Sequence, residues 1–317
     1  MDEDRQFDEP ALVPRDFDTL VQIANRAEAA VPTGLATAAF DRAFAARRAG
    51  QWDGFVPDDD IDAAESYARA VEQFDAVARG LTERQWVAPV ATYGSVHDLV
   101  AHLLAIEIYT GKQVRLFERA TIGADHDHVR LGDALLAQWR TADHHEVLAA
   151  WRDHARQIVA ALNNEPLLLD APASWHGAPI DVRALLVIRT FELWTHADDV
   201  RVAIGSPRDE PDNAQLKLMT NLAAEILPLG LELTGRPHPG RTLRLVLTGR
   251  GGGTWHCPLA AASTVTAHDD LVLVADAVEF CRLAANRCTP AALDAYVEGD
   301  EIIASDILRG MAALAAD

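Results

Sequence analysis

Residues 182–205 have the sequence VRALLVIRTFELWTHADDVRVAIG, which is typical of one long helix in a bundle. Asp181 precedes it as an N-cap, and Gly205 follows it as a residue that can adopt the left-handed conformation at a helix end. Glu192 and His196 are four residues apart, so both project from one face of this helix. The same face carries Leu185, Arg189, Leu193 and Val200. We therefore predict that the Glu192–His196 pair points into the bundle and needs a polar partner there.

A second helix is predicted to begin after Ser95 and to run to about residue 119. Ser95 as N-cap, with Asp98 three residues later, resembles a capping box. The apolar stripe of this helix is formed by Leu99, Leu103 and Ile106. His102 lies within that stripe, so it is predicted to face inward as well. If the two helices pack together, His102, Glu192 and His196 converge on one point.

Two histidines and one carboxylate are the ligand set of a catalytic zinc site, because they leave positions for water or substrate. The same set also binds non-haem Fe(II), so the metal stays open. There is a simpler interpretation of the pattern alone: His102 is a core histidine satisfied by hydrogen bonds, and the Glu192–His196 spacing arises by chance. Arg189 is expected to form a helix-surface ion pair with Glu192.

The rest of the chain divides into three regions. Residues 1–60 are predicted to be a helical N-terminal extension, and residues 61–232 a four-helix bundle. Residues 233–317 are predicted to form a small α+β domain. Further helices are predicted at 62–81, 144–162, 213–233, 276–286 and 300–315. Strands are predicted at 242–248, 254–257, 263–267, 270–274 and 295–297. The fold class is therefore α+β and mainly α.

The composition of the chain argues against several classes of partner and location. The formal net charge is −20, from 28 basic and 48 acidic side chains. Such a charge repels phosphate backbones and anionic lipids, which argues against nucleic acid and membrane partners. The start of the sequence lacks the pattern of a secretory signal, and no stretch has the length of a membrane span. The three cysteines (Cys257, Cys281 and Cys288) include no C-x-x-C pair. A reducing compartment, the cytoplasm, is expected.

Several smaller motifs are expected to be structural. His126 and His128, and the pair His144-His145, suggest a second metal site, but a solvated surface is the expected interpretation. The residues at 250–253, Arg-Gly-Gly-Gly, are predicted to form a hairpin turn. Cys257 and Cys281 are expected in the core. Asp198 is expected to be solvated.

Two segments carry a resemblance to a known family. SVHDLVAHL at 95–103 and ELWTHADDVR at 192–201 resemble the metal-ligand segments of the mycothiol-dependent maleylpyruvate isomerase family, part of the larger DinB-type four-helix metalloenzymes. Residues 242–317, with Val-Glu-Gly-Asp at 297–300, resemble the sterol-carrier-like domain of that family. The resemblance extends from residue 62 to the end. One departure is Ala-Thr-Tyr-Gly at 91–94, where the family often has a Pro-Gly-Trp-type turn, so the local pocket wall is in question.

The resemblance implies a metal site formed by His102, Glu192 and His196, with a divalent ion, zinc as the first choice, and mycothiol as the second cofactor. Asp199 would orient the ring of His196 or remain an ordinary helix residue. An arginine of the second domain would reach the active site and bind a carboxylate of the substrate. Arg287 is the candidate for this catalytic role, and Arg282 or Arg244 are its alternatives.

The function implied is an enzyme in which a metal-bound thiolate adds to a small electrophile. It would be a maleylpyruvate-type cis–trans isomerase or a mycothiol S-transferase in detoxification or natural-product biosynthesis. The alternative from another class is a non-catalytic, metal-stabilised binding protein. The substrate and the oligomeric state stay open.

Overall fold

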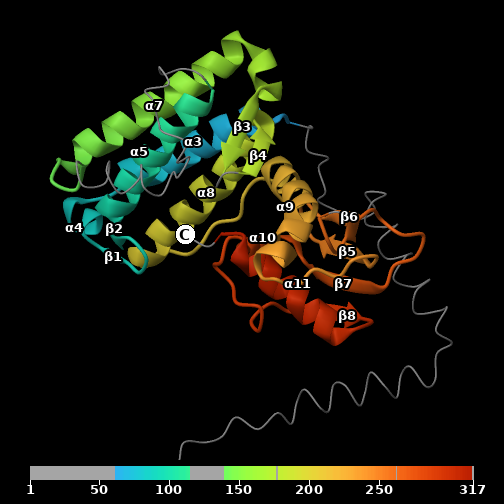
Figure 1. Cartoon of the computed structure of the whole chain (residues 1–317). Helices are drawn as coiled ribbons and strands as arrows, with labels where there is room; N and C mark the ends of the chain where they lie inside the picture. Colours follow the sequence, from blue (N-terminus) through green and yellow to red (C-terminus); the bar gives the residue numbers. More distant parts are fainter. Residues whose placement is uncertain (1–60, 115–138, 176–177, 262, 316–317) are drawn as a thin grey trace, which may run out of the picture. The chain divides into compact units, whose positions relative to one another are not determined.

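The computed structural model describes residues 61–114, 139–175, 178–261 and 263–315, all within one compact unit, Asp59–Asp317 (Figure 1). The predicted extension at 1–60 lies outside the described residues. So do His126, His128 and the last residues of the helix predicted to reach 119.

Four helices form the bundle: α3 (Ala63–Arg79), α5 (Val96–Gln113), α7 (His144–Asn164) and α8 (Val182–Ala203). Helix α3 packs against α7 and α8, and α5 packs against the same two helices, so the four close into a ring (Figure 1). Buried apolar side chains from all four helices fill the interior. The predicted four-helix arrangement is confirmed.

The predicted helix starts are also confirmed. Asp62, Ser95, Asp143 and Asp181 each accept a hydrogen bond from a backbone N–H of the first turn. These side chains satisfy donors that have no partner within the helix. After α8 the chain turns at Gly205, whose φ of +74° is the left-handed conformation that favours glycine.

Short elements between the helices were not predicted from the sequence. Helix α4 (Glu83–Trp86) and the hairpin of β1 (Pro89–Val90) and β2 (Gly94–Ser95) join α3 to α5. The 3₁₀ turn η1 (Pro166–Asp170) and a second hairpin lead from α7 to α8. That second hairpin pairs β3 (Pro172–Trp175) with β4 (Ala178–Asp181). These elements are too short for a helical or alternating period to be visible in the sequence.

Helix α9 (Asn213–Leu233) connects the bundle to a four-stranded sheet of order β6-β5-β7-β8. The strands are β5 (Thr242–Thr248), β6 (Gly253–Pro258), β7 (Leu271–Asp276) and β8 (Ala295–Glu298). Strands β5 and β7 are parallel, and the other neighbours are antiparallel. The predicted turn at 250–253 joins β5 to β6 as a hairpin.

Helices α10 (Ala277–Ala284) and α11 (Glu301–Ala313) complete this half and lie with α9 on one side of the sheet (Figure 1). Helices α9 and α11 approach closely at Gly230 and Gly310, where a Cβ on either glycine would collide with the backbone of the other. Glycine is required there because the two backbones are in contact.

The strand predicted at 263–267 is wrong. Residue 262 is not described, and residues 263–267 form no strand. Strand β5 already has β6 on one side and β7 on the other, so its two edges are occupied. The threonines of the segment bind locally instead: the Thr266 backbone N–H and hydroxyl both contact the Thr242 hydroxyl. Such side-chain bonds compete with strand pairing.

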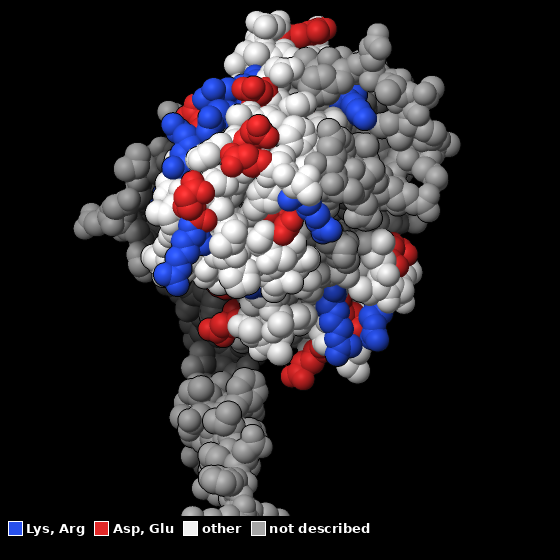
Figure 2. Space-filling view, turned by 90° about the vertical axis from the view of Figure 1, so that its left-hand side faces the viewer, with Lys and Arg blue, Asp and Glu red and all other residues white. Residues whose placement is uncertain are grey.

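The fold is thus a mainly helical α+β fold, as predicted. None of the described helices has the length and hydrophobicity needed to cross a membrane. On the face drawn in Figure 2, exposed basic side chains stand next to acidic ones. Charges of both signs are therefore interspersed on that face.

Candidate functional site

His102 on α5 and His196 on α8 meet inside the bundle. Their ring centroids are 5.6 Å apart, with the ring planes at 80° to each other. His196 is buried, with 3% of its surface exposed, and His102 is half-buried. The two histidines thus come together from different helices, as the sequence predicted.

Tyr93, in the turn of the β1–β2 hairpin, covers both histidines. Its ring centroid lies 4.7 Å from that of His102 and 5.2 Å from that of His196. The hairpin is anchored at its base by Ser95, which also caps α5. Tyr93 therefore forms one wall of the site at the position where the sequence departs from the resembled family.

His196 is oriented by an acidic partner one turn further along α8. Its Nδ1 lies 3.0 Å from Oδ2 of Asp199. Arg287, in the segment after α10, binds the same carboxylate with Nε at 3.1 Å and Nη2 at 2.7 Å. Burial by itself would raise the pKa of Asp199, but the hydrogen bonds from His196 and Arg287 outweigh it and lower that pKa to about 2. Asp199 is thus an ionised acceptor held by two donors.

Glu192, the third expected metal ligand, is bound to an arginine. Its Oε2 accepts a hydrogen bond from Nη1 of Arg189, whose Nη2 lies 3.0 Å from Oε1 of Glu107. Tyr67 donates to the other oxygen of Glu107 at 2.6 Å. Arg189, Glu107 and Tyr67 are fully buried. The expected Arg189–Glu192 ion pair exists, but its location on the helix surface was wrong: Arg189 is a core residue between two carboxylates.

The two histidines fit a single divalent ion. Two imidazoles bound tetrahedrally to one ion have ring centroids about 5 Å apart, since metal–nitrogen bonds are about 2.0–2.1 Å. The observed separation is 5.6 Å. Asp199 lies at Nδ1 of His196, so an ion would be bound through Nε2, the usual arrangement of a ligand histidine with a carboxylate behind it.

Glu192 does not complete a compact ligand group in this conformation. Among the described residues, the group of three whose ligand atoms all lie within 4.8 Å of one another is Glu83, His144 and His145. To join His102 and His196 on an ion, Glu192 would have to turn an oxygen away from Arg189. Its side chain is 19% exposed, so it lies at the edge of the buried network and has space in which to turn.

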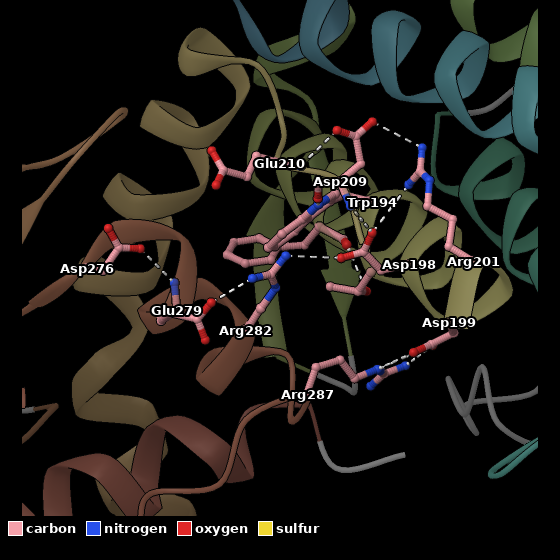
Figure 3. A network of polar contacts seen from close by, with 12 residues as sticks. Trp194, Asp198, Asp199, Arg201, Asp209, Glu210, Asp276, Glu279, Arg282 and Arg287 are labelled. Atoms are coloured by element: carbon pink, nitrogen blue, oxygen red, sulfur yellow. Dashed lines mark hydrogen bonds and ion pairs between the residues drawn. The ribbon is translucent and has the colours of Figure 1, made fainter. Parts of the chain in front are cut away.

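A second polar network lies beside the site (Figure 3). Asp198 accepts hydrogen bonds from Arg201, from Arg282 of α10 and from the backbone N–H of Asp209. Only 4% of its surface is exposed. The expectation that Asp198 is solvated was therefore wrong, because Asp198 receives an arginine from each half of the described structure.

This network separates the roles of the candidate arginines. Arg282 binds Asp198 and Glu279, while Arg287 binds Asp199 (Figure 3). Arg244 lies on β5, where the nearest acidic atom is an oxygen of Asp269 at 3.9 Å. Arg287 is thus the one of the three that contacts the His196–Asp199 pair.

The cysteines lie outside this cluster. Cys257 and Cys281 are buried core residues, as expected. Burial raises the pKa of Cys257 to about 12 and also raises that of Cys281. Cys288 is half-buried next to Arg287, and burial followed by the charge of Glu279 raises its pKa as well. These thiols are therefore protonated at neutral pH.

The fold is a four-helix bundle in which two histidines from different helices meet. Residues 67–201 match the family model described as the mycothiol maleylpyruvate isomerase N-terminal domain. The matched segment is thus similar to the N-terminal domain of the mycothiol-dependent maleylpyruvate isomerase family, the family whose metal-ligand segments the sequence resembles.

Solved structures agree on the fold. The chain resembles the crystal structure of the mycothiol-dependent maleylpyruvate isomerase at 14% identity and a TM-score of 0.51. It resembles a point mutant of that enzyme at 12% identity and a TM-score of 0.52. Both likenesses cover 74% of this chain and 91% of the other. No curated protein sequence matches the chain significantly.

Proposed function

We propose that the chain is a metal-dependent and thiol-dependent enzyme. In the proposed reaction the thiolate of mycothiol adds to a small electrophile. The observation that carries the proposal is the convergence of His102 and His196 from two helices, with Asp199 and Arg287 behind His196. A core histidine satisfied by a single hydrogen bond needs neither a second imidazole beside it nor an arginine behind its carboxylate partner.

His102, His196 and Glu192 are the proposed metal ligands, and zinc is the proposed ion. Two neutral imidazoles and one carboxylate leave a coordination position for an external ligand. When bound, the ion would hold a thiol sulfur and lower its pKa, so that thiolate is present at neutral pH. For Glu192 to take part, its carboxylate must exchange its contact with Arg189 for the ion.

Asp199 and Arg287 are proposed to act through His196. Asp199 accepts a hydrogen bond from Nδ1–H of His196, which fixes the ring orientation and leaves Nε2 as the ligand atom. Arg287 holds Asp199 ionised by a two-point contact. One nitrogen, Nη1, bonds the carbonyl of Ala285, so the whole guanidinium is fixed in place. Arg287 is therefore proposed as a positioning residue of the site, and a substrate carboxylate would reach it only by competing with Asp199.

The thiol is proposed to come from outside the chain. Cys257 and Cys281 are buried in the sheet half, and their raised pKa values keep them protonated. The pKa of Cys288 is raised as well. A protein thiolate is thus a poor nucleophile here. The three free cysteines also fit a reducing compartment, which is why the cytoplasm is the proposed location.

Two outcomes of thiolate addition are compatible with these residues. If the adduct forms at a cis double bond conjugated to carbonyl groups, the former double bond can rotate, and expulsion of the thiolate gives the trans product. If the sulfur stays attached and a proton is added, the chain is an S-transferase. The residues of the site are the same for both outcomes.

A non-catalytic, metal-stabilised binding protein is the second candidate function. The observation that favours it is that Glu192 pairs with Arg189 and does not form a compact ligand group with the two histidines. In that case an ion on His102 and His196 would stabilise the bundle, and the site would bind ligands without turnover.

A turnover assay distinguishes the enzyme from the non-catalytic binding protein. Metal-loaded full-length protein is incubated with maleylpyruvate or another activated cis-alkene, with and without mycothiol. Consumption that needs both the ion and the thiol, saturates with thiol and is lost in His102→Ala supports the enzyme. A rate independent of added thiol would exclude thiol-dependent catalysis.

A further inference from the structure

The cluster of Glu83, His144 and His145 lies at the point where α4 meets the first turn of α7. The sequence suggested a solvated pair of histidines there. His144 departs from that expectation, because its side chain is only 15% exposed. Its ring packs against the buried Trp86, at 4.9 Å between ring centroids and 30° between planes. His144 is therefore held in one orientation before any ligand arrives.

Both imidazoles turn toward the same carboxylate oxygen. Nε2 of His144 lies 3.2 Å from Oε1 of Glu83, and Nε2 of His145 lies 3.5 Å from that atom. The two rings are 4.2 Å apart. Consecutive helical residues normally point in directions about 100° apart, so this convergence is not imposed by the helix itself.

The two nitrogen–oxygen distances fit a shared ion as well as they fit hydrogen bonds, whereas the ring centroids, 4.2 Å apart, would separate toward about 5 Å by a turn of the exposed His145 ring. Two ligand atoms at about 2.0–2.1 Å from one tetrahedral ion are about 3.3 Å apart, and 3.2 and 3.5 Å lie on either side of that value. For a hydrogen bond the longer distance is outside the usual range, which ends at about 3.2 Å. Imidazole nitrogens with one carboxylate oxygen suit zinc, copper and nickel.

The backbone around the three residues is fixed. Thr82 and Gln85 form a capping box that begins α4, so Glu83 occupies the first turn of a defined helix. Asp143 caps α7 by accepting from the backbone N–H of His145 at 2.8 Å. His145 also lines a cavity of about 280 Å³ together with Trp86, so there is space beside its ring for water or another ligand.

We propose that Glu83, His144 and His145 form a second metal site, for a divalent first-row transition ion exchanging with solvent. It shares no residue with the site of His102 and His196, and it does not depend on the proposed enzyme function. An ion there links α4 to the start of α7. Since the unfolded chain does not bring the three residues together, binding stabilises the folded protein.

The test titrates metal-free, full-length protein with Zn²⁺ and separately with Ni²⁺, by calorimetry and by thermal unfolding. The variants are His145→Ala and Glu83→Gln, both at exposed positions where the change leaves the core intact. His268→Ala is the matched control, since it removes an exposed histidine from outside the cluster. A double variant, His102→Ala with His196→Ala, removes the site in the bundle.

We expect parent and His268→Ala to bind the ion and to gain thermal stability from it. His145→Ala and Glu83→Gln should bind one ion fewer per chain, or bind it at least tenfold more weakly. The double variant should retain one ion that is lost when His145→Ala is added. Equal stoichiometry and affinity in parent and His145→Ala would overturn the proposal, as would an equal loss in His268→Ala. If the site of His102 and His196 bound no ion, the loss of binding expected in His145→Ala and Glu83→Gln would be unchanged.

Discussion

Arg287 donates to the carboxylate of Asp199 from two guanidinium nitrogens, Nε at 3.1 Å and Nη2 at 2.7 Å. The same carboxylate lies 3.0 Å from Nδ1 of His196. The segment after α10 is thereby tied to the bundle helix that carries the buried histidine. Figure 3 shows this contact beside the separate network of Asp198. The proposed site thus depends on residues from both halves of the described structure.

Replacing Arg287 by alanine should lower kcat/KM without removing the metal. Asp199 would lose its two-point partner, and His196 would lose a fixed orientation. We expect a cost of about 2 kcal/mol in transition-state binding, the low end for breaking a partly buried charge pair. The measurement is steady-state kinetics together with the metal content of each variant. Arg282→Ala is the matched control, since Arg282 binds Asp198 and not Asp199. Equal losses in both variants would contradict the role given to Arg287.

Asp199→Asn should weaken metal binding in the bundle. The amide keeps the size of the side chain but is a poorer acceptor for the Nδ1 proton of His196. Loss of such an outer partner weakens metal affinity by about 10–100-fold. Competition with a chelator measures the change, in a His145→Ala background that removes the other proposed site. Asp198→Asn serves as control, and unchanged affinity in Asp199→Asn would show that Asp199 does not support a ligand.

Arg189→Met should strongly destabilise the fold. Arg189 is fully buried between Glu107 and Glu192, so its removal leaves buried carboxylates uncompensated. Breaking a buried pair in this way costs about 3–5 kcal/mol. Urea unfolding gives the change, and adding Glu107→Gln should recover part of it. Arg183→Met, which removes an exposed partner of Asp170, should cost about 0–1 kcal/mol. Similar small effects from both changes would contradict a buried charge network.

Tyr67→Phe should reduce the loss of stability at alkaline pH. Burial and then the charge of Glu107 raise the pKa of Tyr67 well above its ordinary value. A group with a raised folded pKa contributes its full stability below the unfolded pKa, near 10, and loses it as pH rises toward the folded value. The parent should therefore lose more stability than Tyr67→Phe between about pH 8 and pH 11. Tyr296→Phe, at a half-exposed position, should behave like the parent.

The long helices and the meeting of His102 with His196 were predictable, because both depend on local periodicity and capping. The ion pair of Glu192 with Arg189 was predicted, but its burial was not. Arg189 is buried because Glu107, on another helix, is its second partner. The position of Glu107 next to Ile106, in an apolar run, was the signal that could have indicated a buried charge there. The same reason explains Asp198: its partner Arg282 comes from 84 positions further along the chain, and a single helix pattern does not contain it.

Tyr93 was named only as a departure from the resembled family, and nothing in the hairpin pattern indicated that its ring would cover both histidines. The false strand at 263–267 has a related cause. Its composition favours a strand, but the segment contacts Thr242 of β5, whose two edges are already paired with β6 and β7. Short elements and long-range partners are set by tertiary packing, which local sequence does not encode.

The central claim, that the histidine pair binds an ion that in turn binds a thiol, is tested most directly with cobalt. Metal-free protein in the His145→Ala background is loaded with Co(II), and its visible spectrum is recorded while mycothiol is added. The account predicts an absorption change that saturates, release of a proton because thiolate ligation deprotonates the thiol, and loss of both in His102→Ala. A spectrum unchanged at millimolar-order thiol in the cobalt-loaded protein would contradict the claim.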